Sequence, residues 1–417
     1  MRALGRQPVR ACEQRPVRPR SGRRRGPVTV TEAMPIPLVD WRPHARRLAD
    51  AHLRPESRWW APIASVPRHI FVPRWFERTD AGRVVRDGPT DTGAWLDAAY
   101  TDTTLVTRIG TVHADHTEPG TTAPPGGWPT SSSTLPTLIV TLYRLASLAD
   151  TSRTLVTTGT GYGTALACHR LGDHHVTSVD VDPYLVQAAT ERLDAIGLHP
   201  HTAVRDVTGF LPAEFDRIIS TVAVRPVPAS WLTALRPGGR LVTTIADTGL
   251  IVVADRTPDG GARGRVAPHW ASFMSARHGD DDEHTTPAAE VWGAADGDGE
   301  EVSGSRYPLL DVQNTWDIRS MLHLKVPGVS HRMGRNDDGS WTMRMAHPDG
   351  SWARADAPTR REPPTVHQGG PRRLWDTLEK IRTYLNTWGE LPLHGAEVTI
   401  TPDGETTLHR GHWSATL

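Results

Sequence analysis

The chain has 417 residues, 37% of them hydrophobic, which is enough for two or three domains with apolar cores. Its 47 basic and 47 acidic residues cancel, so the composition as a whole indicates neither a nucleic-acid partner nor a membrane surface. The chain has only two cysteines, which excludes a disulfide framework and a cysteine zinc site and favours a cytoplasmic location. No apolar run approaches the ~18–20 residues of a membrane helix, which excludes a membrane span.

An arginine-rich arm occupies residues 1–33, with nine arginines and two glutamates. No apolar segment follows its basic residues, so the arm lacks the pattern of a secretory signal. We interpret it as a disordered extension. A nucleic-acid-binding tail and a start of translation at Met34 are the alternatives.

Residues 34–125 are predicted to form an N-terminal region that caps the substrate and cofactor site. Asp40–Leu53 is predicted to be an amphipathic helix, because four apolar residues share one face: Ala45, Leu48, Ala49 and Leu53. Val66–Phe76 mixes apolar and basic residues around two prolines and is predicted to be extended. The stretch from His116 to Thr134 is rich in glycine, proline and threonine, so it cannot continue a helix or a central strand.

A helix is predicted to follow directly, because Pro136 suits a first helical turn and a leucine stripe comes after it, formed by Leu138, Leu142 and Leu145. The Ser/Thr run before the proline suits an N-cap.

Residues 126–265 alternate β-prone runs with helical segments, which predicts a doubly wound, mostly parallel α/β sheet. The predicted strands are Thr154–Thr158, Val176–Asp180, Thr202–Asp206, Asp216–Val224 and Gly239–Ile245. The predicted helices are Thr164–Gly172, Pro183–Gly197 and one within Pro228–Gly239.

The character changes after Arg265. Residues 266–306 are assigned to a linker or loop, because Gly279–Ser305 is acidic and glycine-rich. Residues 307–417 are predicted to form a C-terminal α+β accessory domain for peptide recognition. Its signals are two Asp-Gly-Ser-Trp turns, a helix and a final hairpin, at Asp338–Trp341, Asp349–Trp352, Arg372–Gly389 and Ala396–Arg410.

A glycine-rich loop lies between the first strand and first helix of the α/β unit, where glycine lets the backbone turn sharply and approach a ligand. Asp180 closes the second strand about twenty residues later, where a carboxylate can accept hydrogen bonds from both ribose hydroxyls of an adenosine ligand. Asp206, which ends the third strand, could take the adenine amino group. The alternative for Asp180 is a cap on the helix at Pro183, for which Asp182 competes.

Nicotinamide and flavin cofactors are the main rivals, but they favour Gly-x-Gly-x-x-Gly, whereas Gly159, Gly161 and Gly163 are spaced two and two. No Gly-Lys-Ser/Thr is present for a nucleoside triphosphate. S-adenosylmethionine carries no phosphate and needs only the tight turn, so it is the expected cofactor. The predicted cofactor-binding residues are Gly159, Thr160, Gly161, Tyr162, Asp180, Val181, Asp206 and Val207. No metal site is expected, since His113, Asp115 and His116 are interpreted as a surface loop.

Three segments in chain order resemble the protein-L-isoaspartate O-methyltransferase family: Val66–Pro73 (VPRHIFVP), Ala99–Leu105 (AYTDTTL) and Phe215–Val242. The resemblance covers about Asp40–Met274. It implies a class I methyltransferase fold with a Rossmann-like sheet, and methylation of a carboxylate.

The C-terminal part resembles a narrower branch, found beside ATP-grasp ligases in graspetide maturation systems, through Asp349–Ala353, His367–Asp376 and Val398–Glu405. That resemblance implies methylation of an aspartate side chain in a ligase-cyclised precursor peptide, followed by closure of the ester to an aspartimide. The implied partners are the precursor peptide and an ATP-grasp ligase, with no nucleic acid and no membrane. A general isoaspartyl repair enzyme and a catalytically weak peptide-binding scaffold are the alternatives.

The chain departs from the family pattern at two points: Thr157 stands where the family has an acidic residue, and Val207 where it has glycine. The family's Ser-x-Pro element places its proline at Pro136 and its serine at Thr134, directly after Ser132 and Ser133. The resemblance therefore implies that Thr134, Ser133 or Ser132 orients the substrate carboxylate. The alternative is that these residues only cap the helix.

Overall fold

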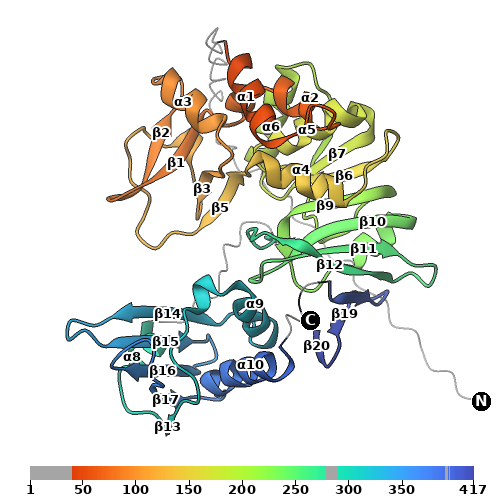
Figure 1. Cartoon of the computed structure of the whole chain (residues 1–417). Helices are drawn as coiled ribbons and strands as arrows, with labels where there is room; N and C mark the ends of the chain where they lie inside the picture. Colours follow the sequence, from red (N-terminus) through yellow and green to blue (C-terminus); the bar gives the residue numbers. More distant parts are fainter. Residues whose placement is uncertain (1–39, 279–288, 390–392, 394) are drawn as a thin grey trace, which may run out of the picture. The chain divides into compact units, whose positions relative to one another are not determined.

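The computed structural model describes residues 40–278, 289–389, 393 and 395–417 (Figure 1). The arginine-rich arm and residues 279–288 lie outside the described residues, so the predictions made for them stay predictions. Within the described ranges the strands form one ten-stranded sheet and two five-stranded sheets.

The ten-stranded sheet begins with five parallel strands in the spatial order β8, β7, β6, β9, β10. They span His201–Val204, Val176–Asp180, Thr154–Thr157, Phe215–Val224 and Leu235–Ile245. Helices α5, α6 and α7 connect them and span Tyr162–Leu171, Pro183–Asp194 and Ala229–Ala234. The chain builds outward from β6 to β8 and then crosses back to β9, which creates a crevice at the carboxyl ends of β6 and β9. The predicted doubly wound α/β fold is confirmed.

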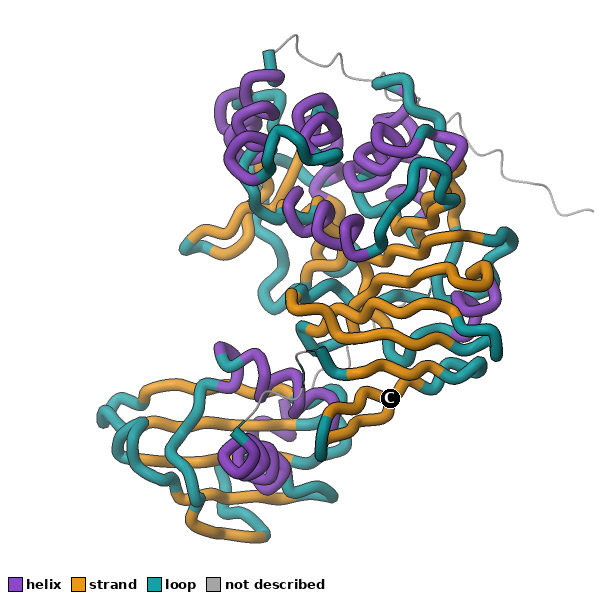
Figure 2. Tube along the Cα trace, turned by 45° about the vertical axis from the view of Figure 1, so that its right-hand side comes forward, coloured by secondary structure: helices purple, strands orange, loops and turns teal. Residues whose placement is uncertain are grey.

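Five antiparallel strands extend the same sheet, in the order β11, β12, β18, β19, β20. Figure 2 shows strands of this sheet, in orange, running side by side. They span Leu250–Arg256, Ala262–Trp270, Glu397–Ile400, Thr406–Arg410 and Trp413–Thr416. The predicted final hairpin is present, but it pairs with β12 and not with the C-terminal sheet. Every second residue of β18 is buried, so the hairpin completes the large sheet with its apolar face.

The N-terminal region contains α1 to α3, the short 3₁₀ helices η1 and η2, and a sheet of β1 to β5. Their bounds are Arg42–His52, Trp60–Ser65 and Thr92–Ala99 for the α-helices, Arg68–Phe71 and Ala114–His116 for η1 and η2, and Arg74–Thr79, Gly82–Asp87, Leu105–Ile109, Val112–His113 and Pro129–Ser133 for the strands. The predicted first helix is confirmed, and its apolar face is buried. The prediction that Val66–Phe76 is fully extended is wrong at η1, where the chain turns directly after Pro67.

The Ser/Thr run before Pro136 is a strand, because β5 pairs antiparallel with β3. Helix α4 (Pro136–Leu145) begins at the proline as predicted, but its N-cap residue, Leu135, makes no side-chain cap. Asp102 supplies the missing acceptor, taking hydrogen bonds from the Thr137 backbone nitrogen at 2.9 Å and from its hydroxyl at 2.6 Å. The prediction that the Ser/Thr run caps this helix is therefore wrong.

The C-terminal sheet has the antiparallel order β13, β17, β16, β15, β14, with strands at Glu301–Gly304, Thr365–Gly369, Trp352–Ala357, Trp341–Ala346 and Ser330–Arg335. Helices α8, α9 and α10 accompany it, at Ala289–Ala294, Trp316–Lys325 and Leu374–Trp388, with a 3₁₀ turn, η4, at Val312–Asn314. Both predicted Asp-Gly-Ser-Trp turns are confirmed between consecutive strands. The described part of the segment predicted to be a linker contains α8 and β13, so it is not only a loop. Strand β13 pairs with β17 of the C-terminal sheet. No helix among the described residues is both long and apolar enough to cross a bilayer.

Candidate functional site

A cavity lies at the carboxyl ends of β6, β7 and β9, where the order of the parallel strands switches. Its other walls are β5 and the segment 274–277, which runs beside the end of β9. Six of the predicted site residues line it: Ser132, Thr134, Gly159, Asp180, Val181 and Val207. Ser133, Thr160, Gly161, Tyr162 and Asp206 do not.

The glycine loop divides into positions with different tasks. Gly159, with φ +50°, lines the cavity. Gly161, with φ +92°, packs against helix α6, since a Cβ there would lie 2.9 Å from the Cβ of Ala189. Tyr162 is buried beneath the loop, with the Arg68 guanidinium 5.4 Å from its ring centre. Close backbone approach to a ligand is therefore available at Gly159, while Gly161 serves packing.

Asp180 is held at the end of β7 by two backbone hydrogen bonds. Its carboxylate accepts from the nitrogen of Gly159 at 3.0 Å and from that of Asp182 at 3.1 Å. Burial raises the pKa of Asp180 above its ordinary value, against the opposing effect of these hydrogen bonds. Asp182 is the residue that caps α6, accepting from the nitrogen of Tyr184 at 3.0 Å, so the capping alternative for Asp180 is wrong.

Asp206 does not line the cavity, and its carboxylate is engaged by other residues of the chain. It accepts hydrogen bonds from the Thr208 hydroxyl at 2.7 Å and pairs with His278 Nδ1 at 2.8 Å. Burial acts to raise the pKa of Asp206, but these hydrogen bonds hold it below its ordinary value. The side chain of Val207 lines the cavity in its place, and the predicted contact of Asp206 with adenine stays a prediction.

Two of the three candidate hydroxyl residues, Ser132 and Thr134, face the cavity. Ser133 lies on the opposite side of the strand, where its buried hydroxyl accepts a hydrogen bond from Arg68 Nε at 3.4 Å. Thr130 and Ser131 line the cavity as well, so simple alternation does not explain the split, and the hydrogen bonds between Ser133 and Arg68 account for it. Thr157 also lines the cavity, and its hydroxyl lies 2.7 Å from that of Thr221.

Arg68 fixes the segment that carries these hydroxyls, and the sequence analysis did not identify this role. Its fully buried guanidinium donates to the carbonyls of Ser133 at 3.1 Å and Thr134 at 3.3 Å. It also donates to three carbonyls at the end of α3 and in the loop after it, those of Ala99, Thr101 and Thr103. Burial lowers the pKa of Arg68 to about 10, so the group stays charged at neutral pH. A basic residue among apolar ones at Val66–Phe76 was the available signal.

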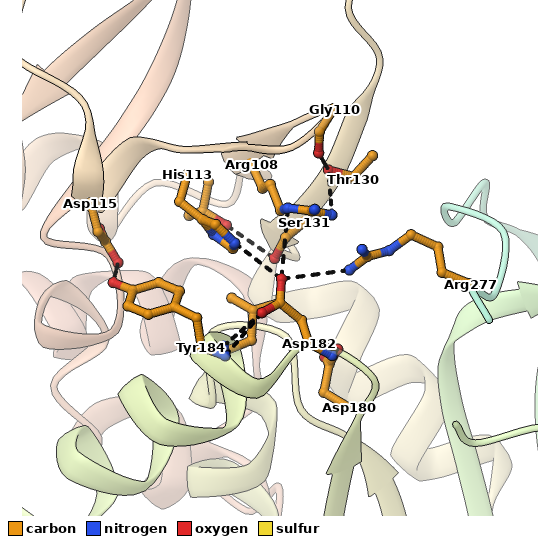
Figure 3. A network of polar contacts seen from close by, with 12 residues as sticks. Arg108, Gly110, His113, Asp115, Thr130, Ser131, Asp180, Asp182, Tyr184 and Arg277 are labelled. Atoms are coloured by element: carbon orange, nitrogen blue, oxygen red, sulfur yellow. Dashed lines mark hydrogen bonds and ion pairs between the residues drawn. The ribbon is translucent and has the colours of Figure 1, made fainter. Parts of the chain in front are cut away.

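Asp182 is the centre of a polar network beside the cavity (Figure 3). Its Oδ2 lies 3.0 Å from His113 Nε2, 3.7 Å from Arg108 Nε and 3.9 Å from Arg277. Burial opposes ionisation of Asp182, but the hydrogen bond from His113 and the charge of Arg108 lower its pKa to about 2.

Asp115 also contacts helix α6. It forms an ion pair with Arg192 at 2.6 Å and accepts a hydrogen bond from the Tyr184 hydroxyl at 2.8 Å. The side chains of His113 and Asp115 are only 11% and 15% exposed, so their interpretation as a surface loop is wrong. Among the described residues, no three His, Cys, Asp or Glu side chains are grouped to hold a metal ion.

Comparison with known proteins locates the similarity on this site. Residues 125–266 match the model of the family described as protein-L-isoaspartate(D-aspartate) O-methyltransferase (PCMT). Protein-L-isoaspartate O-methyltransferase of Ignicoccus hospitalis is 33% identical over 27% of this chain and 56% of its own length, so the chain spans little more than half of that relative. Protein-L-isoaspartate O-methyltransferase 2 of Archaeoglobus fulgidus is 25% identical over 56% of this chain and 92% of its own length.

A solved structure from Plasmodium falciparum, described as a putative protein-L-isoaspartate O-methyltransferase in complex with S-adenosyl-L-homocysteine, is 13% identical. It covers 57% of this chain and 97% of its own, with a TM-score of 0.39. The sequence matches show that residues 125–266 form a domain like that of the protein-L-isoaspartate O-methyltransferase family.

Proposed function

We propose that this chain is an S-adenosylmethionine-dependent O-methyltransferase that esterifies a carboxylate. The observation that carries the proposal is the cavity itself, which Gly159 and Asp180 line together with the hydroxyl residues Ser132 and Thr134. The family match to residues 125–266 covers all four of these positions.

The residues present fit the cofactor. The Asp180 carboxylate stands at the end of β7, where it can accept from ribose hydroxyls, and Gly159 brings bare backbone to the same wall. When bound, S-adenosylmethionine supplies a methyl group on positively charged sulfur; the acceptor oxygen takes that carbon while the methyl–sulfur bond breaks and its electron pair stays on sulfur.

The chain's own contribution is positioning. An acceptor carboxylate is already ionised at neutral pH, so no strong base is needed. The hydroxyls of Thr134 and Ser132 donate to the carboxylate and orient it, while Arg68 holds their backbone in place. Alignment of this kind can lower a barrier by roughly 7–11 kcal/mol.

We further propose that the acceptor is an aspartate side chain in a ribosomally made precursor peptide that an ATP-grasp ligase has cyclised. Attack of the next backbone nitrogen on the methyl ester then expels methanol and leaves an aspartimide. The support is the resemblance of the C-terminal part to the graspetide branch, and a cytoplasmic location fits such a pathway. General repair of isoaspartyl proteins, and a weakly catalytic scaffold, are the competing functions.

Mass spectrometry of peptides incubated with the protein and S-adenosylmethionine tests the proposal. The cyclised precursor should gain a methyl group and then lose methanol, a net loss of water, whereas the linear precursor should not change. Asp180→Asn should form much less of both products when S-adenosylmethionine is not saturating.

Equal methylation of unrelated isoaspartyl peptides would favour the repair function. Measurable cofactor affinity without any methylated product would favour the scaffold.

A further inference from the structure

Arg277 lines the cavity and belongs to a segment that is hydrogen-bonded to strand β9. The nitrogen of Ala223, near the end of β9, donates to the Met274 carbonyl at 2.8 Å, and the nitrogen of Ala276 donates back to Ala223 at 2.8 Å. These two bonds fix the backbone directly before Arg277. Its side chain is only 14% exposed and lines the same cavity as Ser132 and Thr134.

The charge of Arg277 is only loosely balanced by the described residues, since it lowers the pKa of Asp180 without a hydrogen bond to that carboxylate. Its ion pair is with Asp182 at 3.9 Å, the longest contact of that carboxylate, which His113 and Arg108 approach more closely. Among the described residues, Arg277 makes no hydrogen bond of its own. Figure 3 shows it reaching toward Asp182 from the side opposite His113.

The cavity as a whole carries excess positive charge. Its charged lining consists of Asp180, Arg205 and Arg277. Arg205 is already engaged, since it donates to the carbonyl of Phe210 at 3.0 Å. S-adenosylmethionine bears an ammonium, a sulfonium and one carboxylate, so it is a net cation and a further arginine does not favour its binding. An anionic acceptor is attracted by such an arginine.

We propose that Arg277 binds the ionised carboxylate of the acceptor peptide and selects it against the neutral carboxamide and the ester product. This inference rests on the proposed function and names the group that recognises its substrate. Arg277 is a substrate-binding residue in this scheme, distinct from the hydroxyls that orient the carboxylate.

The ion pair acts on the ground state. The acceptor loses its negative charge as the methyl group is transferred, so an arginine attracts the substrate more strongly than the transition state. Removal of the guanidinium should therefore raise KM without lowering kcat. The neutral ester loses the ion pair, which favours its release.

The test measures peptide binding to protein saturated with S-adenosylhomocysteine, so that it does not depend on turnover. The probes are the cyclised precursor and, in parallel, an isoaspartyl peptide, each beside a counterpart whose acceptor carboxylate is a carboxamide. The wild type should bind at least one acid form roughly 10- to 100-fold more tightly than its amide. Arg277→Gln should bind acid and amide alike, and Arg277→Lys should keep part of the preference.

Arg265→Gln is the matched control, because Arg265 is exposed on the neighbouring strand β12 and should behave as the wild type. Retention of the acid preference by Arg277→Gln, or absence of that preference in the wild type, overturns the inference. A tenfold loss of S-adenosylhomocysteine affinity in Arg277→Gln with the peptide preference intact also overturns it, by assigning the arginine to the cofactor's carboxylate. Failure of the wild type to methylate any peptide counts against the proposed function alone.

Discussion

At the scale of single residues, Asp180 and Asp182 lie only two positions apart but have pKa values shifted in opposite directions. Asp182 faces His113 and Arg108, which hold its pKa near 2, and it caps α6. Asp180 faces backbone nitrogens and the charge of Arg277, which act to lower its pKa, but burial outweighs them and raises it. Burial in a cavity destabilises the ionised carboxylate, and a ligand that donates hydrogen bonds to it offsets this cost. This supports the assignment of Asp180 to the ribose hydroxyls.

This environment predicts a pH dependence of cofactor binding. Only the ionised carboxylate of Asp180 accepts hydrogen bonds from the ribose hydroxyls. Because its pKa is raised above the ordinary aspartate value of 3.8, Asp180 becomes protonated at a higher pH than an ordinary aspartate does. Affinity for S-adenosylhomocysteine should therefore fall as the pH falls through this raised pKa, with a slope of up to about tenfold per pH unit. Isothermal titration between neutral and mildly acidic pH measures it.

Asp180→Asn should bind about 10- to 100-fold more weakly at neutral pH, from the loss of charge-assisted hydrogen bonds worth about 1.5–3 kcal/mol. Its affinity should not vary with pH. Asp80→Asn, on the exposed turn between β1 and β2, is the control and should reproduce the wild-type curve. An unchanged pH dependence in Asp180→Asn would show that another group titrates.

At the scale of elements, strand pairing decides what side chains do. The Ser/Thr run has the composition of a helix cap, yet β3 offers it a partner and Asp102 serves the helix instead. The hydrogen bond with Arg68 then keeps Ser133 out of the cavity lining, to which Ser132 belongs.

The centre of β12 carries a glycine whose absence of a side chain allows the sheet to close. A Cβ at Gly264 would lie 1.8 Å from the carbonyl oxygen of Val253 and 2.5 Å from the Cα of Ala254, both backbone atoms of the paired strand β11. Gly264→Ala should therefore lower the free energy of unfolding by about 1–3 kcal/mol or more. Urea denaturation measures the change.

Gly304→Ala provides the control, since Gly304 also lies in a strand and has open space around its Cβ position. Its unfolding midpoint should stay close to that of the wild type. Equal stability of both variants would mean that β11 and β12 can separate without cost.

At the scale of the whole molecule, the end of the chain returns to the sheet of the α/β unit and does not extend the C-terminal sheet. The last three strands complete the sheet that begins with the cofactor-side strands. Arg225, which follows β9, donates to the carbonyls of His323 and Leu324 in α9. One apolar core contains residues of the large sheet together with residues of α9 and α10.

A chain that ends at residue 395 should lose stability and associate. It lacks the buried side chains of β18 to β20, among them Val398, Ile400, Leu408 and Trp413, and leaves β12 as an open edge. Calorimetry should show a lower melting temperature, and size-exclusion chromatography should show oligomers. A truncated chain that remains monomeric with an unchanged melting temperature would contradict this account.

The sequence by itself determined the order of strands and helices in the α/β unit, the glycine loop and Asp180, because these depend on local periodicity, turn residues and neighbours close in the chain. Only the tertiary structure decided the partners of the Ser/Thr run, the sheet that the final hairpin joins, the contacts of Arg68 with the Ser133 and Thr134 backbone, and the place of Arg277 in the cavity. Strand pairing and the burial of a charge depend on groups that lie tens to hundreds of residues apart. Such contacts leave no period or spacing in the sequence, and they are settled when the backbone brings the two groups together.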